Sequence, residues 1–262
     1  MMMKPRLLTQ LGLLAVLVAG FAGTLALTGC GEALSTRNYD DVAEKIEAER
    51  PQPNAEDDFS FPTVAPSLSR GKQVLAEKCP GYPAAMKTKA SVDGQRPIDM
   101  YIDMAHGKHS CSKEMSRDDR WAAVFYVRSL GGEYDFTMNV ADVKALFGAN
   151  CAVCHGNKGK GNGPLYTGHA SAHELGMAPV KNDFSPPAAN FHDLPRLYNR
   201  TNEQLVMFVK EGIYPSAMPS WYGREDKDKG VVFNDAVITD LVHYVRSLSL
   251  DSESQNNLGD NS

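Results

Sequence analysis

The string Cys151-Ala152-Val153-Cys154-His155 constrains this chain of 262 residues more than any other feature of its sequence. Two thiols separated by two residues and followed at once by a histidine form the attachment signature of a c-type haem. Each thiol can form a thioether to one haem vinyl group, and the histidine then lies below the iron as its proximal ligand. A bare C-x-x-C also occurs in redox dithiols and zinc sites. No thioredoxin-like βαβ pattern accompanies it here, and the nearest later histidines, His169 and His173, lie in a Gly-rich, loop-like insertion. The sequence therefore predicts one covalently attached haem c, held by Cys151, Cys154 and His155.

The first thirty residues have the pattern of an export segment. Lys4 and Arg6 form a basic start, an apolar run covers 7–27, and Leu-Thr-Gly-Cys ends at Cys30. A plain secretory signal ends at small residues and needs no cysteine, whereas this ending resembles a bacterial lipobox, whose cysteine is lipidated. A single transmembrane anchor is the alternative, because the run is about long enough to span a bilayer. We expect a signal peptide at 1–29 and an exported lipoprotein, anchored to the membrane through Cys30 and facing the periplasm or the outer face of the cell membrane.

The remaining cysteines can then be assigned. Of the five in the chain, Cys30 is expected to carry lipid, and the two in the C-x-x-C-H string are expected to carry haem. Cys79 and Cys111 are left over in an oxidising compartment, where disulfides persist. We predict that these two are bridged.

Composition excludes some classes of protein and sets the scale of the fold. The formal net charge is −5 and no cluster of Lys and Arg occurs, which argues against nucleic acid as a partner. With 42% hydrophobic residues the chain is globular and long enough for two domains of about 100 residues each. Residues 30–66 are polar and become rich in proline towards their end, so they are expected to form a tether or linker.

An internal repeat organises the rest of the chain. Residues 71–79 are similar to residues 143–151, and both segments read as a helix that ends in a cysteine. The string Tyr-Val-Arg-Ser-Leu occurs in both copies, at 126–130 and at 244–248, each time in a predicted amphipathic closing helix. In the first copy Cys79 is followed by neither a second cysteine nor a histidine, so that copy has no c-type haem site.

The spacing of the first copy suggests what its two cysteines do. Residues 107–111 mirror residues 212–216 of the second copy, which come just before Met218. Cys111 therefore falls near the distal side of a haem, whereas Cys79 falls at the attachment side. A disulfide between them would stabilise a domain that has lost its cofactor.

The second copy resembles a known family closely. Its run from Cys151 to Pro164, with glycines at 156, 159, 161 and 163, resembles that of a class I cytochrome c of the bacterial respiratory type. Residues 186–191 resemble the mid-loop of that family, in which a proline carbonyl accepts the Nδ1 proton of the proximal histidine; Pro186 and Pro187 are the candidates. Residues 212–221 resemble its distal loop, whose methionine is the sixth iron ligand, which implies Met218.

The resemblance implies an all-α fold with two tandem cytochrome c-like domains, of which the first is degenerate and haem-free. The expected boundaries are 67–132 for the haem-free domain, 137–250 for the mono-haem domain and 251–262 for a disordered tail. Other side chains compete with Met218 for the sixth position: His169, His173 and His192 would give a bis-histidine haem, and Met177 and Met207 are further methionines. Of these, Met207 lies in a predicted helix and is expected in the core.

The resemblance also implies a function. With both axial positions filled by protein, the iron has no open site for a substrate, which indicates an electron carrier rather than an enzyme. We expect single-electron transfer between redox proteins in a bacterial respiratory or photosynthetic chain. The protein is similar to mono-haem lipoprotein subunits of membrane complexes such as alternative complex III. The competing hypotheses are a haem-dependent oxidoreductase, such as a peroxidase or dehydrogenase subunit, and an assembly module of a respiratory complex.

Overall fold

The computed structural model describes residues 61–107, 109–111, 115–164, 188–214 and 216–258. Its internal contacts divide the chain into one unit at 1–56 and a second at 57–262, and all described residues belong to the second unit. The predicted signal peptide, Cys30 and most of the predicted tether lie outside the described residues. No helix in the described ranges is long and apolar enough to cross a membrane.

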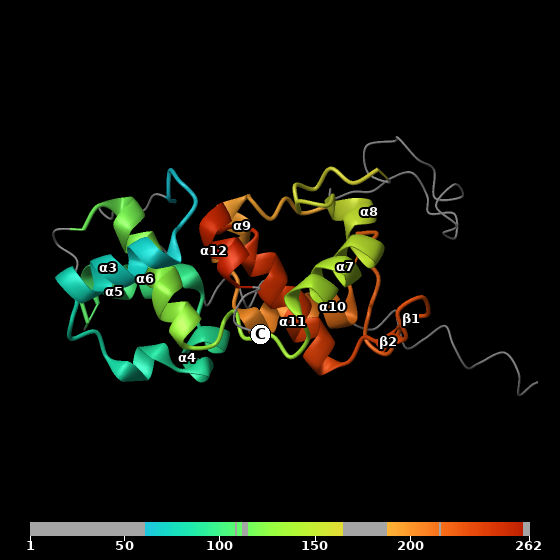
Figure 1. Ribbon diagram of the computed structural model, residues 1–262, viewed down its shortest axis with the longest axis horizontal. Helices are drawn as coiled ribbons and strands as arrows, with labels where there is room; N and C mark the ends of the chain where they lie inside the picture. Colours follow the sequence, from blue (N-terminus) through green and yellow to red (C-terminus); the bar gives the residue numbers. More distant parts are fainter. Residues whose placement is uncertain (1–60, 108, 112–114, 165–187, 215, 259–262) are drawn as a thin grey trace, which may run out of the picture. The chain divides into compact units, whose positions relative to one another are not determined.

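The described part of the chain is mostly helical, as the sequence periodicity predicts (Figure 1). The first half consists of α3 (Leu68–Lys78), the 3₁₀ helix η1 (Ala84–Lys87), α4 (Lys89–Gly94), α5 (Pro97–His106) and α6 (Arg117–Leu130). The second half consists of α7 (Val140–Asn150), α8 (Ala152–His155), α9 (Leu194–Tyr198), α10 (Asn202–Glu211), α11 (Asp235–Ser247) and α12 (Ser252–Asn257). A short antiparallel hairpin joins β1 (Glu225–Asp226) to β2 (Val231–Val232), with Glu225 opposite Val232.

In the first half, α3 lies directly against α6. Ser67 caps the start of α3 by accepting a hydrogen bond from the Arg70 amide, and Ser116 caps α6 in the same way. The two helices cross so closely that a Cβ atom at Gly71 would collide with the carbonyl oxygen of Ala122. Around this crossing, the fully buried Trp121 and its neighbours form one apolar core.

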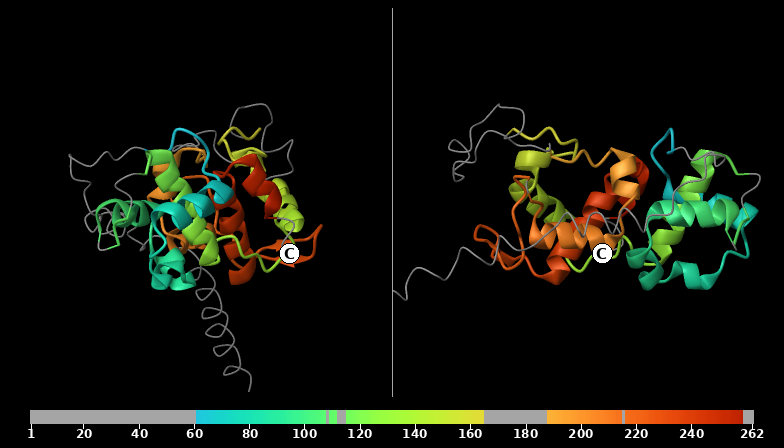
Figure 2. Two further views of the ribbon diagram at one scale, coloured as in Figure 1. Left: turned by 60° about the vertical axis from the view of Figure 1, so that its left-hand side comes forward. Right: turned by 180° about the vertical axis from the view of Figure 1, so that it is seen from behind.

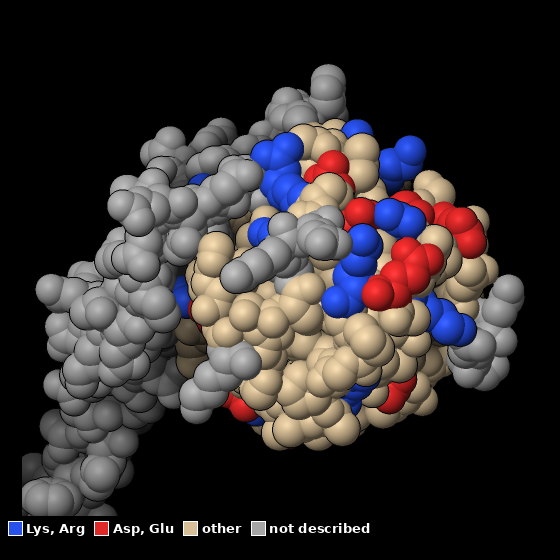
Figure 3. Space-filling model, turned by 90° about the vertical axis from the view of Figure 1, so that its left-hand side faces the viewer, with Lys and Arg blue, Asp and Glu red and all other residues tan. Residues whose placement is uncertain are grey.

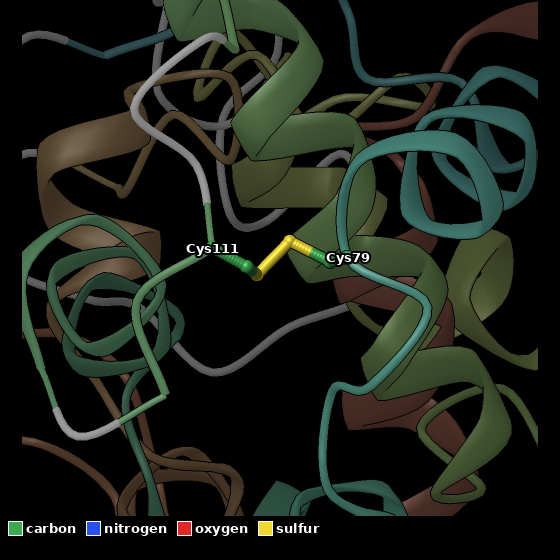
Figure 4. The surroundings of a disulfide bond; sticks show 2 residues. All are labelled: Cys79 and Cys111. Carbon is green, nitrogen blue, oxygen red and sulfur yellow. A yellow bond between two sulfur atoms is a disulfide. The ribbon is translucent and has the colours of Figure 1, made fainter.

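A disulfide closes the first half at the end of α3. Cys79 and Cys111 are bonded, with Cα atoms 5.3 Å apart and a sequence separation of 32 residues (Figure 4). The bond connects the residue that follows α3 to the loop that follows α5, and Cys79 is buried in the core of the first half. In the chain-entropy model, a loop of this length contributes roughly 3–4 kcal/mol by restricting the unfolded state.

We expect the double substitution Cys79→Ser and Cys111→Ser to lower the free energy of unfolding by roughly 3–4 kcal/mol, because the unfolded chain regains the entropy of the open loop. Denaturant unfolding of the full chain measures the loss. The wild-type protein under reducing conditions should lose the same amount. Equal stability with and without the bond would contradict this account.

In the second half, α7 lies against α11. Asn139 caps α7, and the preceding Thr137 instead donates its amide and hydroxyl protons to the buried carboxylate of Asp240 on α11. The rings of Phe147 and Tyr244 lie 5.2 Å apart between the two helices. This helix pair therefore fixes the direction in which the chain reaches Cys151, the residue that follows α7.

The arginines of the repeated string Tyr-Val-Arg-Ser-Leu meet at a single buried carboxylate. Arg128 on α6 donates to both oxygens of Glu133, with its Nη2 atom 2.6 Å from Oε1, and Arg246 on α11 places its Nε atom 3.6 Å from the same oxygen. All three side chains are fully buried. Two cations and one anion in the interior therefore join the closing helices of the two halves.

The same two arginines bind backbone carbonyls at equivalent places in each half. Arg128 donates to the carbonyls of Val92 and Gln95, and Arg246 donates to those of Leu197 and Arg200. In both halves the second acceptor lies two residues before a ten-residue helix, which is α5 in the first half and α10 in the second. These carbonyls lie at or just after the ends of α4 and α9, where a helix leaves carbonyl groups that side chains can bind. The repeat in the sequence is therefore also a repeat of buried polar contacts.

The two halves also share apolar contacts. The helices α9 and α12 lie beside the first half (Figures 1 and 2), and Leu197, Tyr198 and Leu250 lie in its core. The rings of Tyr198 and Trp121 are 4.8 Å apart. The ring of Phe61 lies on the same Trp121, at 6.1 Å. Residues 57–262 accordingly form one compact unit, in which the halves are not independent.

Two sequence expectations about connecting segments are wrong. Residues from 251 onward were expected to form a disordered tail, but 252–257 form α12, and Ser254 accepts a hydrogen bond from the Leu68 amide at 2.9 Å. Residues 61–66 were expected to belong to the tether, but Thr63 donates to Asp118 of α6. Residues 61–66 and α12 are thus fastened to the first half by hydrogen bonds to residues far away in the sequence, which no local pattern reveals.

Replacing Glu133 by glutamine should lower the free energy of unfolding by about 3–5 kcal/mol, because it leaves two buried guanidinium groups without a counter-charge. The glutamine amide has nearly the same volume as the carboxylate, so the loss of stability reports the missing charge and not a change in packing. Denaturant unfolding at neutral pH measures it. Asp99→Asn is the matched control, since Asp99 pairs with Arg96 at a partly exposed site.

The same substitution should change the response to acid. Burial alone raises the pKa of Glu133, but the charges of Arg128 and Arg246 outweigh burial and the pKa is lowered. Burial lowers the pKa of Arg246 to about 10, so this arginine is still charged at neutral pH. A carboxyl group with a lowered pKa stabilises the folded state above its unfolded pKa of roughly 4.3 and loses this contribution as the pH falls. The wild type should therefore lose stability below that pH more steeply than the glutamine variant. Parallel curves would contradict the role given to this carboxylate.

Candidate haem attachment site

The attachment residues lie on one helical turn. Cys151 follows α7 and starts α8, and its carbonyl accepts the amides of Cys154 at 3.2 Å and of His155 at 3.0 Å. Gly156 then ends the turn with a positive φ of 75°. This turn is the local structure that the sequence Cys-Ala-Val-Cys-His needs to present both thiols and the imidazole together.

The two thiols do not have the properties of a redox dithiol. Cys151 and Cys154 are not bonded to each other. Burial raises the pKa of Cys151 to about 12, and it also raises the pKa of Cys154. Catalytic dithiols need a lowered pKa, because the thiolate is the nucleophile. Among the described residues there is also no group of three or more His, Cys, Asp or Glu that could hold a metal ion. These thiols therefore fit thioether bonds better than a redox dithiol.

His155 is prepared to act as a neutral ligand. Its Nδ1 atom lies 3.0 Å from the carbonyl oxygen of Ala189, which has no proton and therefore fixes the proton on Nδ1. Burial lowers the pKa of His155, and the hydrogen bond to Ala189 opposes this effect without reversing it. The Nε2 atom has no hydrogen-bond partner among the described residues and keeps its lone pair. A neutral imidazole with a free Nε2 is the form that binds iron.

The acceptor for His155 differs from the one that the family resemblance implied. The expected acceptor was the carbonyl of Pro186 or Pro187, two residues that lie outside the described ranges. The structure gives this role to the carbonyl of Ala189, a few residues further along the same segment. The sequence indicated the correct segment, but a backbone acceptor carries no side-chain signal that would fix the residue.

Met218 lies in a loop that is fastened to the end of α10. Its carbonyl accepts the Ile213 amide at 3.1 Å, and its own amide donates to Ser216 Oγ at 3.2 Å. Further on, the Trp221 amide donates to the carbonyl of Val209 on α10 at 3.1 Å. Met218 is half-buried, so its thioether is held on a fixed loop and is still accessible.

The competing axial ligands separate into two groups. His169, His173 and Met177 lie outside the described residues. His192 is exposed and its Nε2 atom lies 2.8 Å from the Lys158 carbonyl, which occupies the nitrogen that would bind iron. Met207 is 39% exposed, so its prediction as a core residue is wrong: α10 turns this position outward. Of the described candidates, Met218 fits the sixth position best.

A polar contact just before the motif was not predicted. The side chain of Asn150 donates to the Leu146 carbonyl at 3.0 Å and to Asp226 Oδ2 at 2.7 Å. The other oxygen of Asp226 accepts two amides of its own hairpin, and the hydrogen bond from Asn150 is the main cause of its lowered pKa. The hairpin β1–β2 therefore holds the end of α7 next to Cys151. Its only sequence signal is a polar turn that ends in Gly230.

The surface beside the motif is hollow. A cavity of about 790 Å³ is lined by Ala152 and Val153, which lie between the two cysteines, and by Trp221, Lys158 and Lys160 among others. The lining includes basic and neutral side chains but no acidic side chain among the described residues. The backbone of the attachment turn is thus accessible from this side.

Apolar side chains next to the motif fit a porphyrin. Phe191, Val209 and Trp221 are only half-buried although they pack against the core of the second half, which also contains Cys151 and Ala152. A porphyrin requires a largely apolar environment on both faces and covalent or axial anchors at its edge and centre. The described residues supply apolar side chains that pack on this core, with Cys151, Cys154 and His155 as the anchors. When bound there, the haem would supply an iron that changes its charge by one electron.

Comparison with known families agrees with this assignment. Residues 140–249, from the start of α7 to just after α11, match the family model of cytochrome c. Residues 140–249 thus form a cytochrome c domain, which implies covalent haem c and suggests an electron-transfer haem protein. The match does not extend to the first half. Comparisons with curated proteins and with solved structures gave no match.

The substitution of both Cys151 and Cys154 by serine should remove covalent haem completely, because no other thioether can form. Haem staining of the denatured protein on a gel measures this directly. The matched control is the pair Cys79→Ser and Cys111→Ser, which removes the same number of thiols and should retain the stain. Haem retained by the first variant would contradict the assignment.

Proposed function

We propose that this protein is a membrane-anchored mono-haem cytochrome c that transfers single electrons between redox partners in a bacterial respiratory or photosynthetic chain, as a subunit of a membrane complex. Cys151 and Cys154 attach the haem, and His155 and Met218 are its axial ligands. The observation that carries the proposal is the state of His155: neutral, fixed by the Ala189 carbonyl and open at Nε2.

Two protein ligands on the iron favour electron transfer over catalysis. A sixth position held by Met218 leaves no place for a peroxide or another substrate, and a thioether raises the reduction potential relative to a second histidine. The loop that carries Met218 is fastened to α10 by backbone hydrogen bonds that follow the methionine, from the amides of Trp221 and Tyr222 to the carbonyls of Val209 and Lys210. Displacing this ligand would therefore require the loop to open.

The first half fits a cytochrome c-like domain that carries no haem. Its Cys79 lies at the attachment position of the repeat, but it is bonded to Cys111 and is not available for a thioether. The interior of this half is filled by protein side chains, among which Met100, Met104 and Trp121 are fully buried. The equivalent arginine contacts in the two halves support a common origin of both folds.

The first half is also a candidate assembly surface. On the face shown in Figure 3, basic and acidic side chains are interspersed and part of the surface carries no charge. The ion pairs of this half include Arg70 with Asp119 and Arg96 with Asp99. A test by deletion of this half would be misleading, because Leu197 and Tyr198 of the haem half lie in its core. Charge-reversal variants of exposed residues such as Lys72 would test complex membership without this damage.

The proposed anchor is a lipid on Cys30, at the end of an apolar segment. The wild type should incorporate labelled palmitate and Cys30→Ala should not, because no acyl chains can be attached without this cysteine. Autoradiography of the immunoprecipitated protein measures this outcome. A wild type that carries no label and keeps its first thirty residues would indicate a transmembrane anchor instead.

The sixth ligand is tested by spectroscopy of the full-length protein. The oxidised wild type should show the weak near-infrared band of a methionine-ligated haem, and Met218→Ala should lose it and gain the ability to bind CO when reduced. Met207→Ala is the matched control and should behave like the wild type. A wild type that lacks the band and binds CO would support an enzyme instead. A wild type that lacks the band and does not bind CO would indicate two histidine ligands.

A further inference from the structure

One aromatic side chain lies flat against the imidazole of the attachment motif. The rings of His155 and Phe191 are 4.6 Å apart between centroids and inclined by only 17°. Phe191 is two residues beyond Ala189, whose carbonyl binds Nδ1 of the same imidazole. The segment therefore holds His155 twice, once at the edge of the ring and once on its face.

The ring of Phe191 is itself held in place. Its amide donates to the carbonyl of Gly159 at 2.7 Å. Gly159 has a positive φ of 68°, and a Cβ atom at this position would collide with the phenyl ring. From within the core, the ring of Phe147 contacts Phe191 edge-on at 6.3 Å. The ring of Phe191 thus has few alternative positions. It limits the rotation of the imidazole of His155 about the Cβ–Cγ bond.

We propose that Phe191 is a positioning residue for the haem iron, and that its stacked ring fixes the plane in which the imidazole of His155 meets the metal. This inference rests on the proposed function, in which His155 is the proximal ligand. The hydrogen bond to Ala189 constrains Nδ1, but a ring can still tilt about that contact. A flat aromatic neighbour restricts the tilt, because stacked rings prefer a narrow range of separations. Partners that orient a ligating histidine also tune the metal that it binds.

The test compares Phe191→Leu with Phe191→Tyr in the full-length oxidised protein. Leucine keeps apolar volume but has no ring, whereas tyrosine keeps the ring. Electron paramagnetic resonance reports the orientation of the axial imidazole through the largest g value of low-spin iron. We expect the leucine variant to shift or broaden this signal and to change its reduction potential, while the tyrosine variant restores both to wild-type values. Phe125→Leu is the matched control, since it removes a fully buried ring from the first half and should leave the signal unchanged.

Unchanged g values and potential in Phe191→Leu would overturn the proposal and would leave Phe191 as an ordinary core residue. A wild type without a low-spin signal would instead overturn the proposed function itself, so the two failures are distinct. If the leucine variant does not load haem, nuclear magnetic resonance of the reduced wild type decides the question. A cross-relaxation peak between the ring protons of Phe191 and His155 is expected, and its absence would overturn the proposal.

Discussion

The buried carboxylate of Glu133 is the interaction on which the described fold depends. It neutralises one of two fully buried arginines that come from the closing helices of both halves. Burying three charges costs several kcal/mol per ion unless their remaining hydrogen-bonding groups are satisfied. Here four backbone carbonyls at two helix ends accept the remaining guanidinium protons, so the cluster also completes both helix ends. The consequence for function is that the cytochrome c domain does not move independently of the first half.

The attachment site shows the same use of distant backbone. The motif places Cys151, Cys154 and His155 on one turn, but the state of the imidazole is determined by Ala189 and Phe191, more than thirty residues further on. On the other side, Asp226 holds Asn150, the residue directly before the first thiol. The residues of the motif therefore supply the anchors, and two segments that are remote in the sequence orient them.

The sequence predicted the parts of this structure that leave a periodic or compositional signal. The helices around residues 140–150 and 235–247 and the attachment string follow from spacing and side-chain type. The pairing of Cys79 with Cys111, inferred from counting cysteines, is present in the structure. Glu133 had no such signal, because it follows two glycines and looks like part of a linker. The polar helix at 252–257 was missed for the same reason: its partner is the start of α3, almost the whole chain away. The predictions of Met207 as a core residue and of Pro186 or Pro187 as the acceptor for His155 were wrong. Which face of a helix is buried, and which backbone carbonyl accepts a hydrogen bond, both depend on tertiary contacts.

The central claim is that one haem is attached to this chain, in its second half only. Mass spectrometry of the intact protein, followed by peptide mapping, tests it most directly. The account predicts the added mass of a single haem, located on the peptide that contains Cys151 and Cys154, and a bonded pair at Cys79 and Cys111. A second haem, a haem on the first half, or a protein produced with its haem-attachment machinery that carries none would contradict it.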